Sequence, residues 1–135
     1  MSVGTVVSFT KEISAHDVEQ FAEASGDVQP IHLDDNYAKR TRFGNRIAHG
    51  MLTAGVISAA IGTQLVPNAI AIYMGQTLQF RAPVWLGDSI TATLEVTELD
   101  VERRRATIST TCTNQKDEVV LTGEALVMLD TVRDE

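Results

Sequence analysis

The middle of the chain carries the most distinctive pattern, a stretch in which apolar residues occupy every side of a helix. Residues 47–65 read IAHGMLTAGVISAAIGTQL, and Met51, Val56 and Ile61 fall on different sides of a helical wheel with Ala and Gly between them. A helix that is apolar all round is normally buried. About 16 such residues span roughly 24 Å, so we predict a buried central helix that is too short to cross a bilayer.

The second half of the chain alternates apolar and polar residues, as half-buried strands do. Apolar side chains stand two apart in residues 70–80, with a break at Gln76. The alternation continues through residues 89–97, 106–113 and 119–129, which are rich in the Thr and Val that strands favour. We therefore predict an antiparallel meander with one apolar face.

The region before the central helix carries signals for short helices. Ser14 is a good N-cap with Asp17 placed as in a capping box, and Gly26 is a natural helix stop. Pro30 keeps the preceding residue away from helical geometry, so residues 27–32 are expected to form a turn or an extended bend. A second short helix is expected at residues 34–38, with acidic residues in its first turn.

Together these elements predict an α+β fold in which an antiparallel sheet wraps around a long buried helix. The 135 residues suit one compact domain, residues 1–135, and the composition of 44 % apolar and 21 % charged residues is that of a globular protein. Because such a sheet leaves strand edges exposed, we expect a homodimer or a higher homo-oligomer.

Composition and charge exclude several function classes. A single cysteine, Cys112, leaves no internal disulfide and no cysteine-rich zinc site. No signal-peptide pattern or membrane-length apolar run is present, so we expect a cytoplasmic protein that binds no membrane. The net charge of −7 argues against nucleic-acid binding. Residues 36–87 nevertheless contain no Asp or Glu, which indicates either a site for a small anionic ligand or a buried segment.

Asp27 and His32 are candidate catalytic residues. They stand five positions apart on a loop held by Gly26 and Pro30. A carboxylate beside an imidazole can share acid–base work on one water molecule without a metal. The alternative is structural, with Asp27 capping a helix end and His32 hydrogen-bonded in the core.

The start of the central helix offers a second candidate feature. His49 and Gly50 stand where this helix begins. The free backbone N–H groups of a helix start can polarise a carbonyl oxygen, and Gly50 has no side chain to obstruct a thioester. Ser58, two turns further on, either orients water or a catalytic side chain or bonds back to the backbone. Residues 50–62 contain no Asp, Glu or His, so the acid and the base must come from the preceding loop.

Residues 21–38, FAEASGDVQPIHLDDNYA, resemble the signature of the MaoC-like (R)-specific enoyl-CoA hydratases, known as hydratase 2. In that signature G-D-x-N-P is followed by an aliphatic residue and His, and here Gln29 replaces the Asn. The segments FGNRIAHGMLTAGVISA and LQFRAPVWLGDSITATLEV are also similar to this family. The resemblance runs from about Val7 to Leu129.

The resemblance implies the hot-dog fold, a homodimer with acyl-CoA sites at the subunit interface, and hydration of a trans-2-enoyl-CoA to (R)-3-hydroxyacyl-CoA, reversibly. Asp27 and His32 would be the catalytic pair, either one acting as base. Gly50 would bind the thioester oxygen, and Ser58 would support the site. From its place at the helix start, His49 is a further candidate for positioning the substrate; the alternative is that His49 caps the helix and Gly50 only permits tight packing. The CoA thioester is the substrate, and no cofactor or metal is expected. The basic residues expected to meet the CoA phosphates are Lys39, Arg40, Arg42 and Arg46.

Two other functions remain open at this point. A hot-dog acyl-CoA thioesterase would use the same pocket to hydrolyse the thioester, although the central helix lacks the carboxylate that some of these enzymes carry there. A non-catalytic acyl-binding domain would keep the fold without needing Asp27 and His32 together. The sequence leaves open the acyl chain length and the physiological direction.

Overall fold

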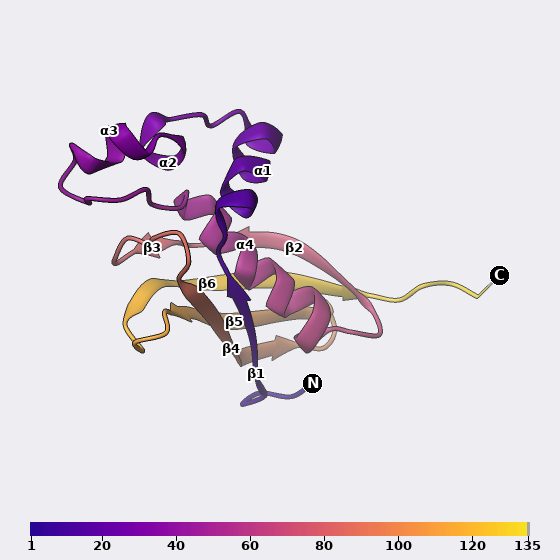
Figure 1. Cartoon of the computed structure of the whole chain (residues 1–135). Helices are drawn as coiled ribbons and strands as arrows, with labels where there is room; N and C mark the ends of the chain where they lie inside the picture. The colour runs from indigo at the N-terminus through magenta and orange to yellow at the C-terminus, as the bar shows by residue number, and fades with distance from the viewer. Residues whose placement is uncertain (135) are drawn as a thin grey trace.

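A curved antiparallel sheet wraps around one long helix in the computed structural model, which describes residues 1–134 (Figure 1). The strands are β1 (Val6–Glu12), β2 (Ile70–Gln76), β3 (Gln79–Phe80), β4 (Ser89–Asp100), β5 (Arg105–Thr113) and β6 (Val119–Asp130). The helices are α1 (Ala15–Ser25), α2 (Pro30–Leu33), α3 (Asp35–Lys39) and α4 (Gly50–Ala60), which continues into a π-helical turn, η1 (Ile61–Leu65). The predicted α+β architecture is confirmed.

The strand order differs in part from the predicted meander. The sheet runs β1-β4-β5-β6-β2 with antiparallel neighbours, and β3 also pairs with β6. The meander is right for β4, β5 and β6 and wrong for β2, which lies beyond β6. Strand β1 was not predicted; it pairs with β4 at the opposite edge. Alternation along a strand identifies its two faces but not its neighbour in the sheet.

The core lies between the inner face of the sheet and α4. Alternate side chains of β4 and β5 are fully buried, in keeping with the period-2 pattern. They are Ile90, Ala92, Leu94, Val96, Ala106, Ile108 and Cys112. From α4 they meet the buried side chains of Val56, Ile57 and Ala60. This packing fixes the axis of α4 relative to the sheet.

Helix α4 departs from the prediction of a helix buried on every side. It begins at Gly50, and one face of it is uncovered in the single chain: Met51 is 57 % exposed, and Gly55, Ser58 and Gly62 are also exposed. The apolar pattern was interpreted as burial within one chain, but none of residues 1–134 covers that face. Among residues 1–134, no helix is long and apolar enough to span a bilayer.

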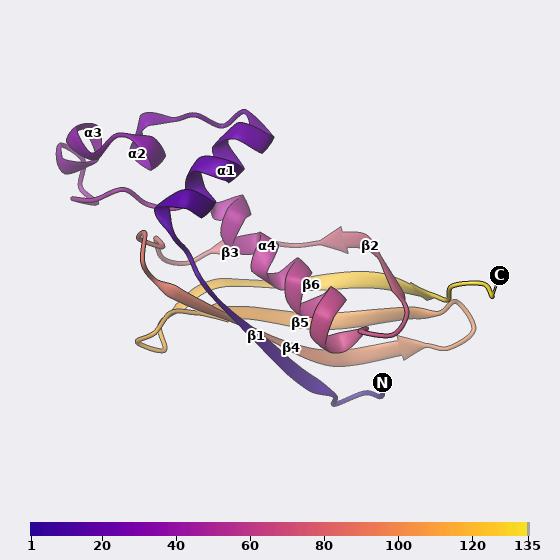
Figure 2. The same cartoon turned by 45° about the vertical axis from the view of Figure 1, so that its right-hand side comes forward.

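The short helices α1, α2 and α3 gather beyond the N-terminal end of α4 (Figure 2). The predicted capping box is confirmed, since Ser14 Oγ accepts from the Asp17 N–H at 3.1 Å and Asp17 Oδ2 accepts from the Ser14 N–H at 3.0 Å. Gly26 ends α1 with a φ of 83°. Pro30 begins α2 instead of holding a turn, because its fixed φ also suits the first helical position.

Candidate functional site

A cavity of about 740 Å³ opens at the N-terminal end of α4. Five of the predicted site residues line it, namely Asp27, His32, Arg42, His49 and Gly50. Its other walls are largely apolar and come from α1, α4, β6 and the segment that runs from β3 to Val84; they include Phe21, Met51, Thr53, Phe80, Val84 and Val120. The fold therefore brings the turn after α1, the turn of α2 and the start of α4 to one cavity.

The turn that follows α1 fixes Asp27. The Asp27 N–H donates to Ser25 Oγ at 3.1 Å, and Asp27 Oδ1 accepts from the Gln29 N–H at 3.3 Å. An Asp side chain bonded to the backbone two residues later is an Asx turn. The contact uses the backbone of Gln29, so the departure from Asn at this position leaves it in place.

The hydrogen bond of His32 to the backbone defines its tautomer. His32 is buried, and its Nδ1 lies 2.7 Å from the carbonyl oxygen of Ile47, just before α4. A carbonyl oxygen can accept a hydrogen bond but cannot donate one, so Nδ1 carries the hydrogen. In the neutral ring Nε2 is then left as an acceptor. It can take a proton from a neighbouring water.

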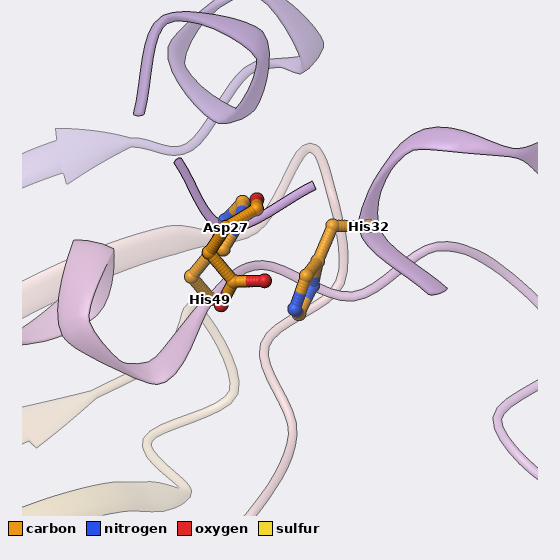
Figure 3. Close-up of side chains that lie close together, drawn as sticks. All are labelled: Asp27, His32 and His49. Carbon is orange, nitrogen blue, oxygen red and sulfur yellow. The ribbon is translucent and has the colours of Figure 1, made fainter. Parts of the chain in front are cut away.

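Asp27, His32 and His49 lie together, as Figure 3 shows. Each offers one ligand-type atom, and these atoms all lie within 4.8 Å of one another. The two imidazoles stack with centroids 3.8 Å apart and planes 25° apart, so their in-plane lone pairs run side by side and do not converge as tetrahedral zinc ligands do. The arrangement suits a shared water better than a metal. The expected absence of a metal stays a prediction.

Gly50, the first residue of α4, presents a free amide. Within residues 1–134 no acceptor takes its N–H in a hydrogen bond. The first N–H groups of a helix have no intrahelical partner and lie at the positive end of the helix dipole. An oxygen placed on this amide would be polarised, as an oxyanion site requires.

The basic residues divide into different environments. Arg42 lines the cavity, with its guanidinium 4.7 Å from the Phe43 ring centroid. Arg40 is exposed above the Tyr37 ring and lies outside the lining. The predicted role of both in binding CoA phosphates stays a prediction, as does that of the exposed Lys39.

Arg46 is half-buried and bonded within the protein. Its Nη1 donates to the carbonyl oxygens of His32 and Leu33 at 3.4 Å, and its Nε lies 2.9 Å from Asp35 Oδ1. These contacts support the end of α2 and thereby His32. Its predicted role toward CoA stays untested.

Ser58 lies apart from the cavity, on the uncovered face of α4. The expectation that it is buried is wrong, because this side of the helix faces away from the sheet. Two turns of helix, about 11 Å, separate it from Gly50. Among the described residues Ser58 does not reach the cavity, and its predicted support of the site stays a prediction.

Most of the other lining residues were not among the predicted site residues, and three of them bear on the chemistry. Arg81, whose Nε donates to Thr122 Oγ1 at 3.1 Å, adds a second cation to the lining. Thr53 is buried, and its hydroxyl has no hydrogen-bond partner in the part of the chain that the structure describes. Phe80 covers the start of α4. Arg81 belongs to the acid-free stretch of the sequence, which was a signal for it, whereas no local pattern distinguishes Thr53 or Phe80.

Comparisons with known proteins agree with this geometry. A family model described as "MaoC like domain" matches residues 2–120. A 3-hydroxybutyryl-CoA dehydratase from Methylorubrum extorquens is 55 % identical over 127 residues, 94 % of this chain and 80 % of that protein. An (R)-specific enoyl-CoA hydratase from Rhodospirillum rubrum is 49 % identical over 126 residues, 93 % of this chain and 86 % of that protein.

A solved structure confirms the fold. The unliganded R-hydratase from Pseudomonas aeruginosa matches with a TM-score of 0.90 at 42 % identity, covering 98 % of this chain and 84 % of that one. The curved sheet with α4 packed against it is thus the hot-dog fold expected from the resemblance.

Proposed function

The chain belongs to the MaoC-like domain family, and on that premise we propose that it is an (R)-specific enoyl-CoA hydratase, a hydro-lyase that also runs as a 3-hydroxyacyl-CoA dehydratase. One observation carries the proposal: the Asp27 carboxylate, the acceptor nitrogen of His32 and the unpartnered Gly50 amide belong to residues that line one cavity. These are the groups that addition of water to an enoyl thioester requires.

The Gly50 N–H activates the substrate. A thioester carbonyl oxygen that accepts this hydrogen bond withdraws electrons from the conjugated double bond and makes C3 electrophilic. The stabilisation grows as negative charge develops on the oxygen in the transition state. The positive end of the α4 dipole adds to it.

Asp27 and His32 handle the proton. A water between them gives up one proton to the carboxylate or to His32 Nε2 while its oxygen bonds to C3. The π electrons of the C2–C3 bond pass to the thioester and then form a C2–H bond with a proton returned by this pair. The product has gained one water, and the enzyme recovers its original protonation state. Either member can act as base.

Arginine side chains of the cavity lining favour binding of the CoA portion of the substrate. Arg42 and Arg81 both line it, and arginine matches phosphate oxygens in geometry and charge. Because the cavity is otherwise mainly apolar, the acyl group would lie inside while the phosphates stay at this rim. The acyl-CoA is a substrate, and the proposal requires no cofactor.

We further propose a homodimer. Strand β2 is an edge strand that exposes Ile70, Ile72, Tyr73 and Met74. Helix α4 exposes Met51. Apolar edges are normally covered by a partner. Met51 also lines the cavity, which supports a site at the subunit interface.

Ile72→Lys should convert the dimer to monomer in analytical ultracentrifugation, and a wild type that sediments as a monomer would contradict the proposal. The cytoplasmic location stays a prediction.

The function is tested by product analysis with crotonyl-CoA. We expect loss of the enoyl absorbance, formation of (R)-3-hydroxybutyryl-CoA and no release of free thiol. His32→Gln should abolish most of this activity, while the matched control His16→Gln, at an exposed histidine of α1, should retain it. Release of thiol would instead indicate a thioesterase, and binding without turnover a non-catalytic acyl-binding domain.

A further inference from the structure

His49 links the two members of the catalytic pair without belonging to it. It immediately precedes Gly50 and is 3 % exposed. Its Nε2 lies 2.9 Å from the carbonyl oxygen of Asp27. Since that oxygen accepts, Nε2 carries the hydrogen. The start of α4 is thereby tied to the turn that holds the Asp27 carboxylate.

The ring of His49 is held between two other rings. On one side it stacks on His32, with centroids 3.8 Å apart and planes at 25°. On the other side it stacks on Phe21 of α1, with centroids 4.8 Å apart and planes at 17°. The face of His49 thus limits where the His32 imidazole can lie, and Phe21 supports it from behind.

The remaining nitrogen of His49 does not offer a substrate contact. Its Nδ1 is shielded from solvent and has no hydrogen-bond partner within the described residues. A substrate in the cavity would therefore meet Gly50, Asp27 and His32 but not this atom. This differs from the role in substrate positioning that the sequence indicated for His49.

Given the proposed hydratase function, we propose that His49 is a positioning residue that sets the geometry of the Asp27–His32 pair: its Nε2–H holds the Asp27 turn while its ring face holds the His32 imidazole. A single side chain thereby couples the carboxylate, the imidazole and the oxyanion amide. Small displacements among such groups are costly, since misplacement of about 1 Å can lower a rate by about 10²-fold.

Three variants separate the two contacts. His49→Ala removes both, His49→Gln keeps a donor at a comparable reach, and His49→Phe keeps the stacked ring. We expect His49→Ala to lower kcat for crotonyl-CoA by roughly 10²-fold with little change in KM. The Gln and Phe variants should each retain part of the rate, and they test the proposal even if the Ala variant folds poorly.

The same substitution in an enzyme whose catalytic pair is already altered distinguishes positioning from general packing. Because His49 acts through both Asp27 and His32, adding His49→Ala to the double variant Asp27→Asn/His32→Gln should cause little further loss of kcat, since effects of residues that act as a unit are not additive. The control His16→Ala should be silent in both backgrounds. An unchanged kcat in His49→Ala, a change confined to KM, or an equal loss in both backgrounds would overturn the proposal. A wild type that does not hydrate crotonyl-CoA would remove the proposed function itself, before any variant is compared.

Discussion

The edge of the Phe80 ring lies beside Gly50, in the space that a side chain at this position would enter. A Cβ built on Gly50 would come within 2.7 Å of Phe80 Cε1 and 3.0 Å of Cζ. Phe80 stands on the two-residue strand β3 and is 53 % exposed, so its ring has space to move aside. A side chain at position 50 would therefore displace Phe80 and change the shape of the cavity without straining the backbone of α4.

Gly50→Ala should impair activity without impairing folding. Alanine is the better helix former, so the melting temperature should hold or rise slightly. The new methyl group and the displaced Phe80 ring would narrow the approach to the Gly50 amide, and kcat/KM for crotonyl-CoA should fall by roughly 10²-fold, the scale of losing an oxyanion donor.

The double variant Gly50→Ala/Phe80→Ala identifies the cause. If the displaced ring blocks the site, removing it should restore part of the lost activity. Unchanged kcat/KM in Gly50→Ala, or a loss that simply follows a lower melting temperature, would contradict a role for this glycine at the carbonyl site.

Gly123→Ala should strongly destabilise the protein. A Cβ on Gly123 of β6 would overlap the backbone carbonyl of Thr77, in the connection between β2 and β3. Backbone held by neighbouring strands cannot move aside as an exposed side chain can, and we expect a loss of about 2–4 kcal/mol. Urea unfolding followed by Trp85 fluorescence, at fixed protein concentration, measures it. Equal midpoints for the variant and the wild type would show that the connection moves freely.

Asp17 should stabilise α1 in a pH-dependent way. The Lys11 ammonium at 2.8 Å and the Ser14 N–H hold the pKa of Asp17 below its ordinary value. With a lowered pKa in the folded state, the stabilisation is present above the unfolded-state pKa and is lost as pH falls through the folded value. Asp17→Asn should therefore cost about 0.3–1 kcal/mol at pH 7. The difference from wild type should shrink as pH falls through the folded-state pKa of Asp17, and a difference that stays constant from pH 7 into acid would contradict this.

Cys112 should be inert in the folded protein. Burial raises the pKa of its thiol to about 12, and thiolate is the reactive form. A thiol reagent at pH 8 should modify no cysteine in the native protein and one per chain after unfolding in guanidinium. Stoichiometric modification without loss of folded structure would show that β5 is accessible.

The elements that were predicted correctly are those that signals within a few residues determine. Ser14, Asp17 and Gly26 specify the two ends of α1 by contacts within a few residues, and strict alternation identified β4, β5 and β6. Strand β1 was missed because it is short and lies at the edge of the sheet. Its place in the fold depends on its pairing with β4, which its own residues do not indicate. Pro30 was assigned to a turn because its fixed φ suits a turn and a first helical turn equally.

The candidate site was predicted as a set of residues but not as an arrangement. Asp27, His32 and Gly50 were identified from residue type and spacing, and the structure gathers them. The tautomer of His32 depends on the Ile47 carbonyl, and the stacking of His49 depends on Phe21, which are contacts between separate elements. The exposure of Ser58 depends on which face of α4 the sheet covers.

The rates of Asp27→Asn, His32→Gln and the double variant test the central claim most directly. If the two side chains share one water, each single variant should lower kcat for crotonyl-CoA by roughly 10²–10⁴-fold. The double variant should be little worse than the slower single one. Asp134→Asn, at an exposed acid near the C-terminus, should match wild type. Wild-type rates in both single variants, with the native fold retained, would contradict the account.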